Sequence, residues 1–180
     1  MVREGRACND RLGELVVTTR GERRDRLSAE EAATWRGFLE AHARAVAQLD
    51  RALAESGCAL DLREYDLLVH LNEAGHGGLR LRDLAARALI NRSNVTRRVE
   101  TLVGRGFVER LADPADGRGV IARLTPAGRQ TLRRAAAVHI PDVKRLVFHD
   151  SSIDLAMVRR FFDDIRAGSS DAANETPAAT

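Results

Sequence analysis

Apolar and polar positions between residues 79 and 125 follow the most regular pattern in the chain. Two helical periods come first, and a polar break at 91–93 separates them. The second helix repeats its apolar residues at spacings of four and three, which is typical of one buried face, and this stripe is Val95, Val99 and Leu102. Two β-rich runs follow, Phe107–Leu111 and Val120–Leu124, joined by Ala112–Gly119. We therefore predict a helix-turn-helix followed by a two-stranded hairpin with a long basic tip, which is a winged helix-turn-helix.

The polar side of the second helix carries arginine and asparagine but no carboxylate. Its residues at helical spacing are Asn94, Arg97, Arg98, Thr101 and Arg105. Arginine pairs with guanine and asparagine with adenine in the major groove, and the first turns of a recognition helix are the part that reaches the bases. We predict DNA contacts there, from Arg92, Ser93, Asn94, Thr96, Arg97 and Arg98. The alternative is that the two adjacent arginines only hold phosphates.

Positive charge is concentrated in the same part of the chain. Between Arg80 and Arg123 there are ten arginines and five carboxylates, a net charge of +5, whereas the whole chain carries +3. The remainder of the chain therefore carries −2. Phosphate binding requires such a focused patch, whereas a packaging protein without sequence preference would spread its basicity over the surface. We interpret the chain as a sequence-specific DNA-binding protein, with a non-specific architectural DNA-binding protein as the alternative.

Amphipathic helices are predicted before the winged region. The first begins at a capping box formed by Ser28 and Glu31 and ends before Gly57, which occupies the position of a C-terminal cap. A second helix spans about Leu62–Ala74. It ends at the glycine cluster 75–78, which we interpret as a flexible connection.

Two more helices are predicted after the wing. The Thr-Pro pair at 125–126 is typical of a helix start. That helix should run toward Phe148 and be kinked by Pro141. The last helix begins at a second capping box, 151–154, and is expected to end at Gly168.

The first and last helices present apolar faces that a monomeric winged helix of this size does not need. A second copy of the chain is the economical partner, and the interface predicted on the last helix is Val158, Phe161, Phe162 and Ile165. The predicted fold is mainly α with a small β-hairpin wing: a winged helix-turn-helix with N- and C-terminal dimerisation helices. The predicted segments are 1–27, a mobile arm; 28–60, a dimerisation helix; 61–125, the DNA-binding domain; 126–168, C-terminal dimerisation helices; and 169–180, a disordered tail.

The sequence lacks patterns typical of enzymes. No His-Glu-x-x-His or comparable ligand spacing is present, and neither Gly-x-Ser-x-Gly nor Ser-x-x-Lys stands out. We predict no catalytic residue, metal site or cofactor. No apolar run approaches the roughly 18 residues of a membrane span, and no signal-peptide core follows the N-terminal arginines, so we expect a cytoplasmic protein. Cys8 and Cys58 are interpreted as ordinary reduced thiols, with a cysteine-based redox-sensing regulator as the alternative.

Several of these runs together resemble the MarR family of bacterial transcriptional regulators. The similarity extends from about Ser28 to Ala167. The chain departs from it at Gly117, where many members carry a second arginine. The runs that carry the resemblance are Asn91–Leu102, Gly106–Val108, the wing run Asp113–Val120 and the run Leu124–Gly128.

The resemblance implies more than the residues show by themselves. By this resemblance, the terminal helices would interleave into a homodimer. Its two recognition helices would face successive major grooves of a near-palindromic operator. Arg118 would enter the minor groove, with Asp116 orienting it or a neighbouring arginine. A small aromatic or anionic effector would bind between the dimer helices and the DNA-binding lobe and release a repressor; regulation by protein level or redox state is the alternative. The candidate effector contacts are Trp35, Phe38, His42 and His70.

Overall fold

The computed structural model describes residues 26–150 and 152–174, without the side chains of 117, 118 and 169–174. The chain is mainly helical with one small antiparallel sheet. It divides into two compact units, 1–44 and 45–180. The elements are α1 (Ala29–Glu55), α2 (Leu62–Glu73), the short 3-10 helix η2 (Gly75–Gly77), β1 (Leu79–Arg80), α3 (Leu81–Arg87), α4 (Arg92–Gly104), β2 (Val108–Asp113), β3 (Asp116–Leu124), α5 (Pro126–Val147) and α6 (Leu155–Asn174).

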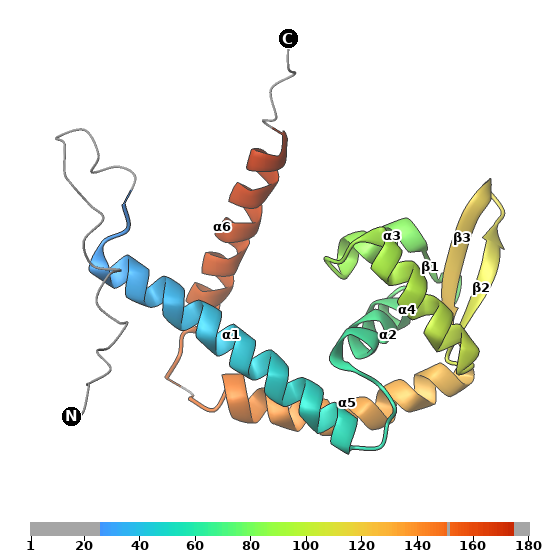
Figure 1. The fold of residues 1–180 in the computed structure, drawn as a ribbon, viewed down its shortest axis with the longest axis horizontal. Coiled ribbons are helices and arrows are strands. Elements are labelled where there is room, and N and C mark those ends of the chain that lie inside the picture. Colours follow the sequence, from blue (N-terminus) through green and yellow to red (C-terminus); the bar gives the residue numbers. More distant parts are fainter. Residues whose placement is uncertain (1–25, 151, 175–180) are drawn as a thin grey trace, which may run out of the picture. The chain divides into compact units, whose positions relative to one another are not determined.

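The core of the second unit lies where α2, α3 and α4 gather beside the sheet (Figure 1). The predicted stripe of α4 points into it, since Val95, Val99 and Leu102 are fully buried. Leucines from the neighbouring helices surround this stripe, so burial of apolar surface sets the position of the helix-turn-helix. The fully buried leucines of these elements are Leu53, Leu67, Leu68, Leu71 and Leu84.

Local capping signals were predicted correctly at two helix starts. Ser28 Oγ accepts from the amide of Glu31 at 3.1 Å, and the carboxylate of Glu31 accepts from the amide of Ser28 at 2.7 Å. Thr125 caps α5 by accepting from the amide of Gly128, with Pro126 in the first turn. Pro141 lies inside α5 without ending it.

The last helix differs from its prediction at both ends. Its start is capped by Asp154, which accepts from the amides of Ala156 and Met157; Ser151 lies outside the described residues. The helix continues past Gly168 to Asn174, so the predicted end at Gly168 is wrong. Gly168 keeps a φ outside the left-handed region, and a Cβ there would meet nothing within 4 Å, so nothing forces the helix to stop.

The sheet has three strands where two were predicted, in the order β1-β3-β2. The additional strand β1 pairs Leu79 with Ala122 and Arg80 with Ile121. Gly78 precedes it at a φ of 69°, and a Cβ at this position would collide with the carbonyl of Ala122. The glycine cluster is therefore not simply a flexible connection, because at its end it lets two backbones approach closely.

The wing is longer and its tip shorter than predicted. β2 and β3 pair from Val108 with Leu124 to Asp113 with Asp116, with an irregularity at Ala112 and Asp113. Only Pro114 and Ala115 separate the two strands. The predicted loop Ala112–Gly119 is wrong, because most of it belongs to the strands, whose backbone pairing outweighs the glycines. No helix in the described ranges has both the length and the apolar character needed to cross a membrane.

Candidate nucleic-acid interface

Helix α4 presents an ordered, exposed N-terminus. Asn91 is the N-cap, and its side chain accepts from the amide of Asn94 at 2.9 Å and from the hydroxyl of Ser93 at 2.9 Å. No acidic residue lies in the first turn. A capped helix start without carboxylates attracts anions, because its free amides point outward and the helix dipole is positive there. The predicted contact residues at this end are exposed or half-buried: Arg92, Ser93, Asn94, Thr96 and Arg97.

The structure separates Arg98 from the other predicted contact residues. Its Nη1 lies 2.5 Å from Oδ2 of Asp61, the N-cap of α2, and the arginine side chain is largely covered. The DNA contact predicted for Arg98 must therefore compete with an ion pair inside the protein. Sequence spacing could not reveal this, since the two residues lie 37 positions apart.

Arg105, the other arginine on this face, is also held inside the protein. Its Nη2 and Nη1 lie 2.9 Å and 3.0 Å from the two carboxylate oxygens of Glu64, and Nη1 also donates to the carbonyl of Ala59. Glu64 is only 5% exposed. Its carboxylate also accepts from the amide of Asp61, completing an unpredicted capping box at the start of α2. These bonds compensate the buried charge.

The two pairs together join α4 to the start of α2. The predicted absence of carboxylates holds along the polar face of α4, but in three dimensions two of the three arginines on that face, Arg98 and the C-cap residue Arg105, meet carboxylates of α2 and its N-cap. Arg97 remains, and among the described residues it has no ion-pair partner. Thr101 turns its hydroxyl back to the carbonyl of Arg97, so it supports the helix rather than reaching outward.

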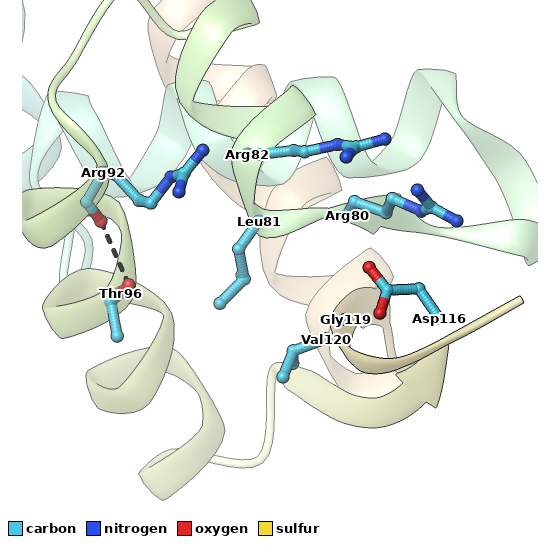
Figure 2. Close-up of a pocket in the computed structure, with 8 residues that line it drawn as sticks. All are labelled: Arg80, Leu81, Arg82, Arg92, Thr96, Asp116, Gly119 and Val120. Carbon is cyan, nitrogen blue, oxygen red and sulfur yellow. Dashed lines mark hydrogen bonds between the residues drawn. The ribbon is translucent and has the colours of Figure 1, made fainter. Parts of the chain in front are cut away.

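A hollow of about 290 Å³ lies beside the N-terminus of α4. Figure 2 shows Arg80 and Arg82 extending side by side on one side of it, with Arg92 and Thr96 of α4 on another. Asp116 of the wing lies close to Arg80 in this view. The hollow thus gathers three arginines from three elements, of which Arg80 is paired with Asp113 and Arg82 with Asp83. A concentration of guanidinium groups suits a polyanion.

The wing is braced by a pair that the sequence did not suggest. Asp113 is 5% exposed, and its Oδ2 lies 2.5 Å from Nε of Arg80, an ion pair rather than a well-directed hydrogen bond. Its Oδ1 accepts from the amide of Ala115 and shapes the tip. Gly119 makes room for this side chain, because a Cβ there would lie 2.8 Å from both Cβ and Oδ2 of Asp113.

The predicted wing pair lies next to this brace. Asp116 is exposed at the start of β3, where it faces Asp113 in the register. The side chain of Arg118 lies outside the described residues. The sequence therefore located the wing correctly but missed its buried aspartate, which only the pairing of β1 with β3 brings within reach of Arg80.

The four candidate effector residues fall into two groups. Trp35, Phe38 and His42 stack along α1, with ring centroids 5.7 Å and 6.3 Å apart, and all three side chains are exposed. His70 lies on α2, in the second unit, with ring nitrogens 3.7 Å from carboxylate oxygens of both Asp66 and Glu73.

A second hollow, of about 410 Å³, lies between α2 and α5 and was not predicted. Tyr65 and Leu132 provide apolar wall, Arg129 and Arg133 provide positive charge, and Glu73 adds one carboxylate. Behind Tyr65 lies His139, with ring centroids 4.5 Å apart. Burial lowers the pKa of His139, against a smaller opposing effect of Asp142, and burial raises the pKa of Tyr65. Both rings therefore favour their neutral forms.

The predicted dimer residues of α6 are exposed in the single chain. Val158, Phe161, Phe162 and Ile165 all belong to the large apolar side chains on the surface. Phe161 and Phe162 contact each other with centroids 5.6 Å apart. Cys58 is buried as a free thiol, and Cys8 lies outside the described residues. Among the described residues no cluster of three histidine, cysteine or carboxylate side chains could hold a metal ion.

Known proteins share this architecture. A model of the MarR family matches residues 60–119. Sco3205, a MarR family transcriptional regulator from Streptomyces coelicolor solved in complex with DNA, is 32% identical, with 86% of this chain and 96% of that chain covered and a TM-score of 0.74. AbsC, a MarR family regulator from the same organism, is 24% identical, with 83% and 99% covered and a TM-score of 0.72.

A third structure was solved with a small molecule. CouR from Rhodococcus jostii RHA1, bound to p-coumaroyl-CoA, is 26% identical, with 80% of this chain and 94% of that chain covered and a TM-score of 0.62. No curated protein matches the chain.

Proposed function

The chain belongs to the MarR family of DNA-binding transcription regulators, and we propose that it acts as a homodimeric, ligand-responsive repressor on a near-palindromic operator. The family is one of regulators rather than enzymes. The observation that carries the proposal is the exposed, carboxylate-free start of α4 beside a hollow lined by Arg80, Arg82 and Arg92. The similarity to Sco3205, which was solved in complex with DNA, supports the proposal.

Base recognition is assigned to the start of α4. Asn94 and Arg97 are exposed there and carry the donors and acceptors that match adenine and guanine edges. Arg92 and Arg82, which line the adjacent hollow, are the proposed phosphate contacts. Arg118 remains the proposed minor-groove contact of the wing, with Asp116 orienting it or a neighbouring arginine, and both roles rest on the family resemblance. Arg98 contributes only if DNA displaces it from Asp61.

Dimerisation is proposed from the apolar surface of α6. A 20-residue helix with phenylalanine, valine and isoleucine exposed along it is costly in water unless another surface covers it. A second copy related by a two-fold axis would cover both helices at once and would place two α4 helices on one face. This symmetry is the reason for proposing a near-palindromic operator.

A small aromatic carboxylate is the proposed effector. The hollow between α2 and α5 combines an apolar wall with the guanidinium groups of Arg129 and Arg133, which suits a planar ring bearing a negative charge. The likeness to CouR, solved with p-coumaroyl-CoA, supports an aromatic and anionic ligand, although that molecule is a thioester that carries its charge on phosphates rather than on a carboxylate. Such a ligand would act by binding one arrangement of the dimer better than another, a coupling of typically about 1–3 kcal/mol. The contacts proposed for Trp35, Phe38 and His42, which lie in the first unit, rest on the family resemblance alone.

One experiment tests the main proposal. Repeated selection from a random duplex library, followed by gel shifts at physiological salt, should yield a near-palindromic site. The protein should bind this site about a thousandfold or more tightly than random duplex. Equal binding of all duplexes would instead identify an architectural protein. A screen of phenolic and carboxylate compounds by thermal shift, repeated on DNA release, tests the effector: hits that stabilise the protein without releasing DNA contradict the switch.

A further inference from the structure

Leu89 combines two features that are each unfavourable in the isolated protein. It is 88% exposed, although it is a large apolar residue. Its φ is 52°, in the left-handed region that leucine rarely adopts. It lies in the turn between α3 and α4, two residues before the cap Asn91.

The structure of the turn explains the left-handed φ of Leu89 but not why an apolar side chain stands there. The amide of Ile90 donates to the carbonyl of Ala85 at 3.3 Å, and the amide of Ala88 to the carbonyl of Leu84 at 3.0 Å. The bond from Ile90 to Ala85 is the six-to-one bond of a Schellman motif, which ends α3. In this motif Leu89 occupies the position that glycine usually takes. Ile90, not Leu89, provides the apolar packing, since it lies against the core. Glycine would fulfil every role that the described contacts assign to Leu89.

The surroundings of Leu89 indicate what its side chain meets. The exposed arginines Arg87 and Arg92 flank it along the chain, and Arg92 lines the hollow beside α4. These two arginines would hold the turn against the DNA phosphates. The uncharged side chain between them would then reach into the DNA groove rather than the sugar-phosphate backbone. The one apolar group that the major groove offers is the C5-methyl of thymine.

We propose that Leu89 is a specificity-determining residue that packs against a thymine methyl group in each operator half-site. The proposal rests on the proposed function, because it requires a preferred DNA sequence. Strain in an exposed residue that no contact among the described residues compensates is typical of a position kept for binding. Without a role in binding, leucine at this left-handed position would only lower the stability of the protein.

The test uses the duplex selected by the unaltered full-length protein and the same duplex with uracil replacing thymine, one position at a time. Uracil lacks only the C5-methyl group. At one thymine per half-site, uracil should weaken binding of the unaltered protein about fivefold, the scale of one buried methyl group or slightly more. Leu89→Gly should weaken binding to the thymine duplex by a similar factor and should not respond to uracil, because coupled partners give non-additive effects. Leu89→Met should bind almost as the unaltered protein does.

Ala59→Gly is the matched control, since Ala59 is exposed and has a φ of 54° but lies in the loop before α2. Both glycine variants should melt no lower than the unaltered protein, and up to about 4 °C higher, because each relieves a left-handed backbone. Only Leu89→Gly should lose DNA affinity. Unchanged affinity in folded Leu89→Gly overturns the proposal, as does a loss that is the same on thymine and uracil duplexes. A failure of the unaltered protein to enrich any sequence would instead overturn the proposed function, before any variant is made.

Discussion

Two adjacent arginines of α4 show how far neighbouring residues can differ in role. Arg98 is paired with Asp61, whereas Arg97 is exposed and, within the described residues, has no ion-pair partner. Side-chain entropy and hydration keep such an arginine available for an external partner. The two arginines are neighbours in one helix and share the same surrounding sequence. The rotation of α4 against α2 therefore decides which of them is available to an external partner.

Arg97→Ala should weaken binding to the selected operator by about 1–3 kcal/mol and relax the preference at one position per half-site. The physical reason is the loss of hydrogen bonds to a base edge. Gel shifts with a set of singly altered duplexes measure this. Arg44→Ala, which removes an arginine from an exposed 3.4 Å pair on α1, is the control and should leave binding unchanged. Equal weakening on every duplex would assign Arg97 to the phosphates.

His139 makes the stability of the protein depend on pH in one direction. Burial lowers its pKa below the ordinary 6.5, so the unfolded chain takes up the proton before the folded chain does. The resulting stability is fully present above pH 6.5 and is lost as the pH falls from there toward the folded-state pKa. Melting temperature measured against pH should fall more steeply in the unaltered protein than in His139→Gln. Parallel curves would contradict this role.

At the scale of elements, the junction of α2 and α4 is held by charges at the start of α2. Asp61 caps α2 and binds Arg98, while Glu64 binds Arg105. Asp61→Asn keeps an oxygen for the cap but removes the charge. Arg98 should then be free to bind a phosphate, so the logarithm of affinity for random duplex should fall with the logarithm of salt more steeply, by about 0.9.

The control for this variant is Asp50→Asn. Asp50 accepts from the amide of Leu62 at 2.8 Å in the same region, but no ion pair with arginine is found for it among the described residues. The salt dependence of DNA affinity should therefore be the same in Asp50→Asn as in the unaltered protein. A slope that stays the same in Asp61→Asn would show that Arg98 already contacts DNA or cannot reach it.

The wing depends on the absence of a side chain at Gly119. Gly119→Ala would place a Cβ 2.8 Å from Asp113 and displace the carboxylate that binds Arg80. We expect the free energy of unfolding to fall by about 1–3 kcal/mol and operator affinity to fall with it. Denaturant titration and gel shifts measure the two effects. Gly104→Ala, where a Cβ meets nothing within 4 Å, should keep or increase stability, by up to about 1 kcal/mol.

At the scale of the whole molecule, the exposed apolar side chains of α6 require a cover. Phe162→Asp should give monomers or unfolded protein, because a charge in an apolar interface lacks a partner there. Light scattering and circular dichroism distinguish the two results. Arg160→Asp, which adds the same carboxylate at an exposed position of the same helix and changes the charge by −2 instead of −1, should stay dimeric. A stable monomer of the unaltered protein would remove both the dimer and the palindromic operator.

Sequence alone determined the features that depend on near neighbours. The capping box of Ser28 and Glu31, the start of α5 at Thr125 and the buried stripe of α4 were all predicted and are confirmed. Each involves residues three or four positions apart, whose geometry follows from one helical turn. The order of helices and wing was predictable for the same reason, and it carried the family resemblance.

Tertiary structure alone decided which polar groups are available and which are paired. Arg98 meets Asp61 from 37 positions away, and Arg105 meets Glu64 from 41. Strand β1, only two residues long, carries too weak a pattern to predict, yet it brings Arg80 to Asp113. Such contacts depend on how packed helices and strands are oriented, and burial of the shared core fixes that orientation. The charge of a residue can be read from the chain, but its partner is chosen by the fold.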